Sequence, residues 1–212
     1  MTHERHDGPG RPPRHGPRKL RITFNAPVVL GFAILCLAAW GANLITKGGS
    51  NNLLFSTYRS SLGNPLTYLR FLTHIIGHID FKHYIGNMAY ILLLGPMLEE
   101  KYGSRRILAV MAATAVITGI VNSLFFSNVA LCGASGVVFA FILMTSFTSF
   151  REGEIPLSFI LVAVIYLGQQ VYEGFFVADN VSNLSHVIGG IVGALVGWSF
   201  NRRPKEKKER PE

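Results

Sequence analysis

Six apolar runs separated by short polar segments dominate the chain. They cover residues 26–46, 81–98, 106–126, 134–150, 155–175 and 184–200. Each run is long enough to cross, or nearly cross, a hydrocarbon core of roughly 30 Å as a helix. The runs are continuous or carry small residues at helical spacing, such as Gly189, Gly193 and Gly197, instead of the alternation typical of barrel strands. The pattern predicts an all-α membrane protein with six transmembrane helices.

Polar and charged residues gather at the two ends of the chain and between the apolar runs. Residues 1–25 and 201–212 are basic tails, and both are expected to be disordered. Residues 26–200 are then predicted to form one membrane domain. The 47–80 connection is long and mixes apolar with polar stretches, which predicts short helices lying in the outer interface of the bilayer.

The composition agrees with a lipid bilayer as the solvent. Of the 212 residues, 49% are hydrophobic and only 15% are charged, which is more apolar surface than one ordinary soluble core requires. The net charge of +8 would suit nucleic-acid binding, but the basic residues flank the apolar runs as topology signals do. We therefore expect no nucleic-acid partner. The two cysteines, Cys36 and Cys132, need no disulfide.

An even number of spans places both termini on one side of the membrane, and the positive charges identify that side. All but four of the 20 Lys and Arg residues lie in the tails or in the 99–106 and 151–154 connections. By the positive-inside rule, both termini are cytoplasmic, and we expect a multi-pass protein of a bacterial cytoplasmic membrane. Cleavage of the first run as a signal peptide is the alternative, but it would leave five spans with termini on opposite sides.

Four polar side chains stand out inside the predicted spans. They are His83 and Asn87 in the second span, Ser135 in the fourth and His186 in the sixth. Polar groups are costly in lipid, so they are functional candidates by default. His83, Ser135 and His186 each lie sixteen residues from the charge that ends their helix, or about 24 Å at the helical rise. Three helices would therefore bring one hydroxyl and two imidazoles to the same depth.

Ser135 and His186 are the candidates for a nucleophile and its base. Ser135 lies at the start of the fourth run, where unpaired N–H groups and the helix dipole suit both a nucleophile and an oxyanion; an N-cap serine is the plain alternative. Small residues on the fourth and sixth runs allow close helix packing, which would bring His186 within hydrogen-bond reach of Ser135 as general base and then general acid. A bond from His186 to a neighbouring carbonyl is the other interpretation. Because no carboxylate lies at that depth, a dyad is favoured over a triad.

The histidines before and within the second run have two possible uses. His74 and His78 lie four residues apart, as zinc-binding histidines of a metalloprotease helix do. Ile75 stands where such a site needs its glutamate, so we expect no metal. His83 and Asn87 share one helix face at a spacing of four, which favours them as hydrogen-bond donors to an oxyanion.

Taken together, these motifs resemble those of the rhomboid family of intramembrane serine proteases, from about Leu66 to Gly197. The matching residues are His78, His83-x-x-x-Asn87, Glu99-x-x-x-Gly103, Gly133-Ala134-Ser135-Gly136 and His186-x-x-Gly189-x-x-x-Gly193. The resemblance implies a six-helix rhomboid-like bundle with Ser135 as nucleophile and His186 as base. It also implies an oxyanion hole made by Asn87, His83 and the Ser135 amide, and structural roles for His78 and Glu99. The expected partners are transmembrane protein substrates, cut near their outer ends without a cofactor, and the lipid bilayer.

The chain departs from the common rhomboid pattern at three positions. Leu69 precedes Arg70 where many members have tryptophan, Ser185 replaces the usual alanine, and Phe139 stands where tyrosine is frequent. None of these changes removes a reacting group, and Phe139 can still pack against the His186 ring. Further support for the site is expected from these residues: Arg70, Gly133, Gly136, Phe139, Gly189 and Gly193.

Two other classes of function are open to such a chain. One is a catalytically silent rhomboid-like protein that binds membrane clients, although members of that kind are expected to lack the serine or the histidine. The other is a channel or transporter, which the absence of an internal repeat and of a buried carboxylate disfavours. The sequence carries no signal of the oligomeric state.

Overall fold

The computed structural model describes residues 24–146 and 180–201, together with positions 157, 160, 161, 164, 165 and 168. Within this part the regular elements are helices: α1 (Pro27–Ile45), a π-helical turn η1 (Asn51–Phe55), α2 (Pro65–Thr73), α3 (Phe81–Tyr102), α4 (Ser104–Phe125), α5 (Ser135–Ser146) and α7 (Asn180–Asn201). Most of the predicted fifth span, most of the two predicted tails and the end of the predicted fourth span lie outside the described residues.

Local sequence signals explain where several helices begin and end. The helices α1 and α2 each have a proline in the first turn, where no N–H is needed. Asp80 caps α3, since its Oδ1 accepts a hydrogen bond from the His83 amide at 2.7 Å. The same helix runs past its predicted end at residue 98 and stops at Gly103, whose φ of 85° suits glycine.

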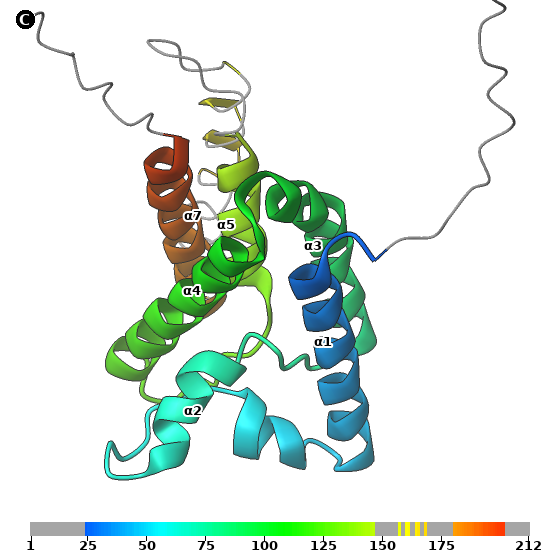
Figure 1. Cartoon of the computed structure of the whole chain (residues 1–212). Coiled ribbons are helices and arrows are strands. Elements are labelled where there is room, and N and C mark those ends of the chain that lie inside the picture. The colour runs from blue at the N-terminus through cyan, green and yellow to red at the C-terminus, as the bar shows by residue number, and fades with distance from the viewer. Residues whose placement is uncertain are drawn as a thin grey trace, which may run out of the picture.

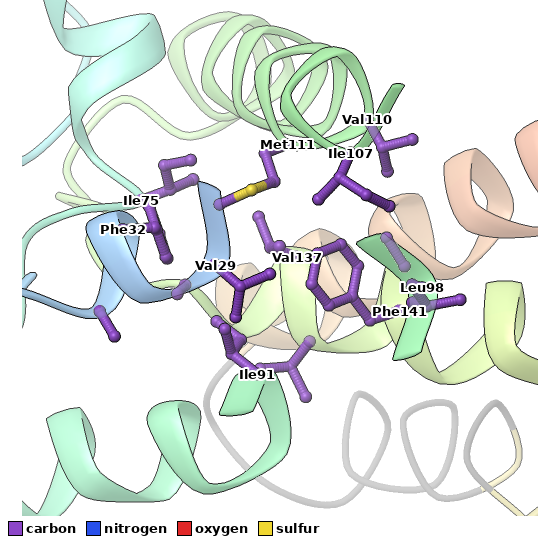
Figure 2. Packing of buried hydrophobic residues seen from close by; sticks show 14 of the residues in the cluster. Val29, Phe32, Ile75, Ile91, Leu98, Ile107, Val110, Met111, Val137 and Phe141 are labelled. Carbon is purple, nitrogen blue, oxygen red and sulfur yellow. The ribbon is translucent and has the colours of Figure 1, made fainter. Parts of the chain in front are cut away.

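The helices pack around one apolar core. The helix α3 lies beside α1, and α7 lies beside α5 and α4 (Figure 1). Val29, Ile91, Ile107 and Phe141, from four different helices, meet at its centre (Figure 2). Many large apolar side chains instead face outward. Apolar surface of this extent marks contact with a membrane or with other proteins.

Two described helices, α1 and α4, are long and apolar enough to cross a membrane by themselves. The helix α5 and the segment Leu184–Phe200 are apolar but shorter. The helix α3 has 22 residues, but it carries His83, Asn87 and a charged last turn, so it is less apolar than α1 and α4.

The helices α5 and α7 approach each other more closely than side chains would allow. A Cβ built on Gly189 would lie 2.1 Å from the Gly136 carbonyl oxygen, and one built on Gly193 would lie 2.2 Å from that of Ala140. Small residues therefore bring the two backbones into contact, as their spacing predicted.

Candidate active site

Ser135 is the first residue of α5 and is half-buried. It follows Gly133, whose φ of 124° is one that side chains other than glycine rarely adopt. The turn therefore delivers Ser135 to a helix N-terminus, where backbone N–H groups have no partner within the helix and the dipole is positive. This is the position that the sequence predicted for it.

The segment that leads to Ser135, residues 126–134, is held by three separate contacts, and we call it the serine loop. Leu131 exchanges two backbone hydrogen bonds with Thr57, of 2.9 and 2.8 Å. The buried Asn122 side chain on α4 donates to the carbonyl oxygens of Thr57 and Val129. The Gly133 amide donates to the His74 carbonyl oxygen at 2.9 Å.

The residues that hold the serine loop were not predicted from the sequence. Thr114, Thr118 and Asn122 recur every four residues along an otherwise apolar run, and all three are buried. That spacing was the available signal for Asn122. Nothing in the local sequence singled out Thr57, because its partner lies far away along the chain.

His186 lies on α7 beside the first turns of α5. Its ring stacks on Phe139 with centroids 4.4 Å apart and planes inclined by 8°. Ser135 and Phe139 share a helix face because they are four residues apart. A Cβ on Gly136 would also lie 3.5 Å from the Ser185 carbonyl oxygen. The stack and the Gly136–Gly189 contact thus place the imidazole next to the helical turn that carries Ser135.

His83 and Asn87 on α3 approach the same turn from another direction. A Cβ on Gly133 would lie 2.6 Å from both Cε1 and Nε2 of His83, and 3.7 Å from Nδ2 of Asn87. Only a glycine leaves room for the His83 ring here. The two polar groups therefore meet the serine loop two residues before Ser135.

His78 lies behind Asn87 and is fully buried. Its Nε2 is 3.1 Å from Asn87 Nδ2, and its Nδ1 is 3.0 Å from the Ile76 carbonyl oxygen. Burial lowers the pKa of His78 to about 4, with a further lowering by His83. The ring is therefore neutral at pH 7.

His74 serves different partners from His78, although the two are four residues apart. The ring nitrogens of His74 bond to the Arg70 carbonyl oxygen at 3.1 Å and to Thr118 Oγ1 at 3.2 Å. Burial lowers the pKa of His74 to about 4. The side chain thus ties the end of α2 to α4 as a neutral ring.

Arg70 and Glu99 connect elements at a distance from Ser135. The Arg70 Nε donates to the Leu53 carbonyl oxygen at 2.9 Å, and its guanidinium lies 4.6 Å from the centre of the Tyr58 ring. The two oxygens of Glu99 accept from the first amides of α1 at 3.0 Å each, and Ser104 Oγ donates to one of them at 2.6 Å. Arg70 therefore braces the 47–80 connection, and Glu99 joins α3 to the starts of α1 and α4.

The chain is similar in sequence to known proteins over the region that holds these residues. The family model described as Rhomboid domain matches residues 65–203. The chain is 31% identical to Rhomboid-related protein 2 of Mus musculus over 159 residues, which cover 65% of this chain and 52% of that protein. It is 27% identical to rhomboid protease GlpG of Yersinia pestis (strain Pestoides F) over 178 residues, which cover 81% of this chain and 62% of that protein. The chain thus matches between half and two thirds of the length of these relatives.

Proposed function

The chain belongs to the rhomboid family, and we propose that it is an intramembrane serine endopeptidase that cleaves transmembrane segments of other membrane proteins near their outer ends. The family places it among integral membrane proteins, and its relatives in Yersinia are named proteases. The proposal includes six transmembrane helices within residues 26–200, the fifth covering 155–175. The basic tails, 1–25 and 201–212, then face the cytoplasm of a bacterial cell by the positive-inside rule.

The observation that carries this proposal is the convergence of three helices at the start of α5. Ser135 begins that helix, His186 of α7 stacks on Phe139 one turn further along, and the α3 pair lies against Gly133. A nucleophile, a base and oxyanion donors are the three parts that acyl transfer needs within reach of one carbonyl group.

The reaction that these groups support has two halves. Ser135 Oγ attacks the scissile carbonyl carbon while His186 takes its proton, and the carbonyl oxygen becomes an oxyanion. Asn87, His83 and the Ser135 amide donate hydrogen bonds to that oxyanion. The C–N bond then breaks as His186 gives the proton to the leaving amine. Water, activated by the same imidazole, attacks the acyl-enzyme and releases the acid and the free serine.

The substrate must unwind locally before this attack. An amide inside an intact helix is already hydrogen-bonded to its own chain and shielded from a nucleophile. Segments with weak helical structure near their outer end are therefore the expected substrates.

The test is cleavage of a single-span membrane protein by the purified full-length chain, in detergent and in liposomes. We expect the wild type to cut, and Ser135→Ala and His186→Ala to be inert. Ser146→Ala is the matched control, since Ser146 lies at the other end of α5 and bonds to the Ile142 carbonyl oxygen. A serine-directed fluorophosphonate should label the wild type and the Ser146→Ala variant but not Ser135→Ala.

Each alternative has its own outcome in this experiment. Undiminished cleavage by Ser135→Ala would remove Ser135 as the nucleophile. A wild-type chain that neither cuts nor takes the fluorophosphonate would instead be a silent client-binding member of the family.

A further inference from the structure

The amide of Asn87 is held on one side by the imidazole of His78. Asn87 Nδ2 lies 3.1 Å from His78 Nε2, and both residues are buried. An amide NH₂ group donates hydrogen bonds and never accepts them. His78 Nε2 therefore accepts this bond and carries no proton.

The other ring nitrogen of His78 leads to the same protonation state. Nδ1 lies 3.0 Å from the Ile76 carbonyl oxygen, which can only accept. Nδ1 therefore carries the single proton of a neutral imidazole. The lowered pKa of His78, about 4, agrees with that state at pH 7.

His78 is itself fixed by elements outside α3. Its carbonyl oxygen accepts from Asn51 Nδ2 at 3.1 Å and from Asn43 Nδ2 at 3.5 Å. Its ring also lies edge-on to Tyr84 of α3, with ring centroids 5.6 Å apart. Asn43 lies on α1 and Asn51 in η1. Two elements besides α3 therefore hold the backbone of His78, whose ring contacts Asn87.

The direction of the second N–H of Asn87 follows from the direction of the first. The two hydrogens of an amide lie in one plane at a fixed angle, so a bond from one of them orients the other. Asn87 Nδ2 lies 3.7 Å from a Cβ built on Gly133, and is thus beside the serine loop. An imidazole that donated from Nε2 would instead favour the flipped amide, with Oδ1 where Nδ2 now lies and no donor for an oxyanion.

We infer that His78 is a positioning residue, whose Nε2 accepts from Asn87 and so directs the remaining Asn87 N–H to the oxyanion formed at Ser135. The inference rests on the proposed function, because the oxyanion belongs to that reaction. It gives the 47–80 connection a part in catalysis: the connection carries the residue that orients an oxyanion donor.

Nitrogen NMR of the full-length protein labelled with ¹⁵N-histidine tests the hydrogen bond without a substrate. Protonated and bare ring nitrogens resonate far apart, and the His78 signals are assigned by their loss in His78→Gln. At pH 7 we expect a protonated Nδ1 and a bare Nε2, with the Nε2 signal shifted in Asn87→Ala. A protonated Nε2, or an Nε2 signal that Asn87→Ala leaves in place, would overturn the inference.

A double-mutant cycle tests the consequence for catalysis. Asn87→Ala should lower kcat about 100-fold with little change in KM, since removing one oxyanion donor costs about 10²- to 10³-fold. His78→Ala alone should lower kcat about tenfold, the size of one lost hydrogen bond. In the Asn87→Ala background, His78→Ala should cost no more than about twofold, which is the usual scatter of additive effects.

His74→Ala is the matched control for the cycle. His74 is an equally buried histidine of the same connection, but its ring bonds to Arg70 and Thr118. The fold-loss of kcat caused by His74→Ala should multiply with the fold-loss caused by Asn87→Ala, as expected for a purely structural effect. Should thermal unfolding show that His78→Ala does not fold, His78→Leu fills the space without accepting a hydrogen bond and takes its place.

The outcomes separate this inference from the proposed function. Suppose that cleavage depends on Ser135 and that the losses of kcat in His78→Ala and Asn87→Ala multiply fully. The inference is then overturned, while the proposed function stands. A wild-type chain with no Ser135-dependent cleavage overturns the proposed function, and the positioning role falls with it, whatever the NMR spectra show.

Discussion

Replacing Gly189 with alanine should sharply slow cleavage, because Gly189 sets the distance between α5 and α7. A Cβ at Gly189 would lie 2.1 Å from the Gly136 carbonyl oxygen and 2.9 Å from Gly136 Cα. Ordinary Cβ contacts are 3.4–4 Å, so α7 must retreat by more than 1 Å. His186 lies less than one turn before Gly189 and moves with it, away from Ser135.

The expected size of the effect follows from that displacement. Moving a reacting group by about 1 Å costs about 100-fold in rate, so kcat should fall by about two orders of magnitude. Overpacking costs about 1–3 kcal/mol of stability, and the gain of about 1 kcal/mol from alanine over glycine inside a helix offsets part of it. The variant should therefore stay folded and unfold at a slightly lower temperature than the wild type.

The assay is Ser135-dependent cleavage of a transmembrane substrate, with thermal unfolding in the same detergent. Gly31→Ala on α1 is the control, because a Cβ there meets nothing within 4 Å and both measurements should stay near their wild-type values. Gly193→Ala lies one turn further from His186 and should cost stability with a smaller loss of rate. Cleavage by Gly189→Ala at the wild-type rate would refute the argument that this contact positions His186.

Three further predictions follow from the described contacts. Glu99→Gln should lower the thermal unfolding temperature, and Glu99→Asp should lower it less. A neutral amide loses the charge-assisted hydrogen bonds to α1, which are worth about 1.5–3 kcal/mol each. An unchanged unfolding temperature in Glu99→Gln would contradict this. The free energy of unfolding should fall as the pH drops from 6.5 towards 4, by up to about 1.4 kcal/mol per pH unit for each of His74 and His78. Burial lowers the pKa of both histidines to about 4, so the unfolded chain takes up protons first. Unfolding followed against pH should show a shallower slope in His74→Gln, and equal slopes would count against it. Phe139→Ala should slow cleavage roughly fivefold, the value of an aromatic stack of about 1 kcal/mol, while Phe139→Tyr should retain the rate; equal losses in the two variants would argue against the stack on His186.

The amino-acid pattern was enough to locate the long described helices and to identify the family of the chain. The apolar runs 26–46, 106–126 and 184–200 differ by only a few residues from the ends of α1, α4 and α7. Hydrophobic length and helix-breaking residues are local properties, so they can be detected without knowledge of the fold. The motifs around Ser135 and His186 identified the rhomboid family for the same reason, while the roles of these residues stay predictions.

Which polar groups meet could be seen only in the folded structure. Glu99 caps a helix that begins about 70 residues earlier, and Asn122 bonds to Thr57, 65 residues away. The bond between Asn87 and His78 depends on the path of the chain into α3. Helical periodicity tells which residues share a face, whereas contacts between elements depend on loop paths and on how closely two backbones approach. Small residues at helical spacing can indicate a close approach, as between α5 and α7, but loop paths are set by the packing of the whole chain and no local pattern encodes them.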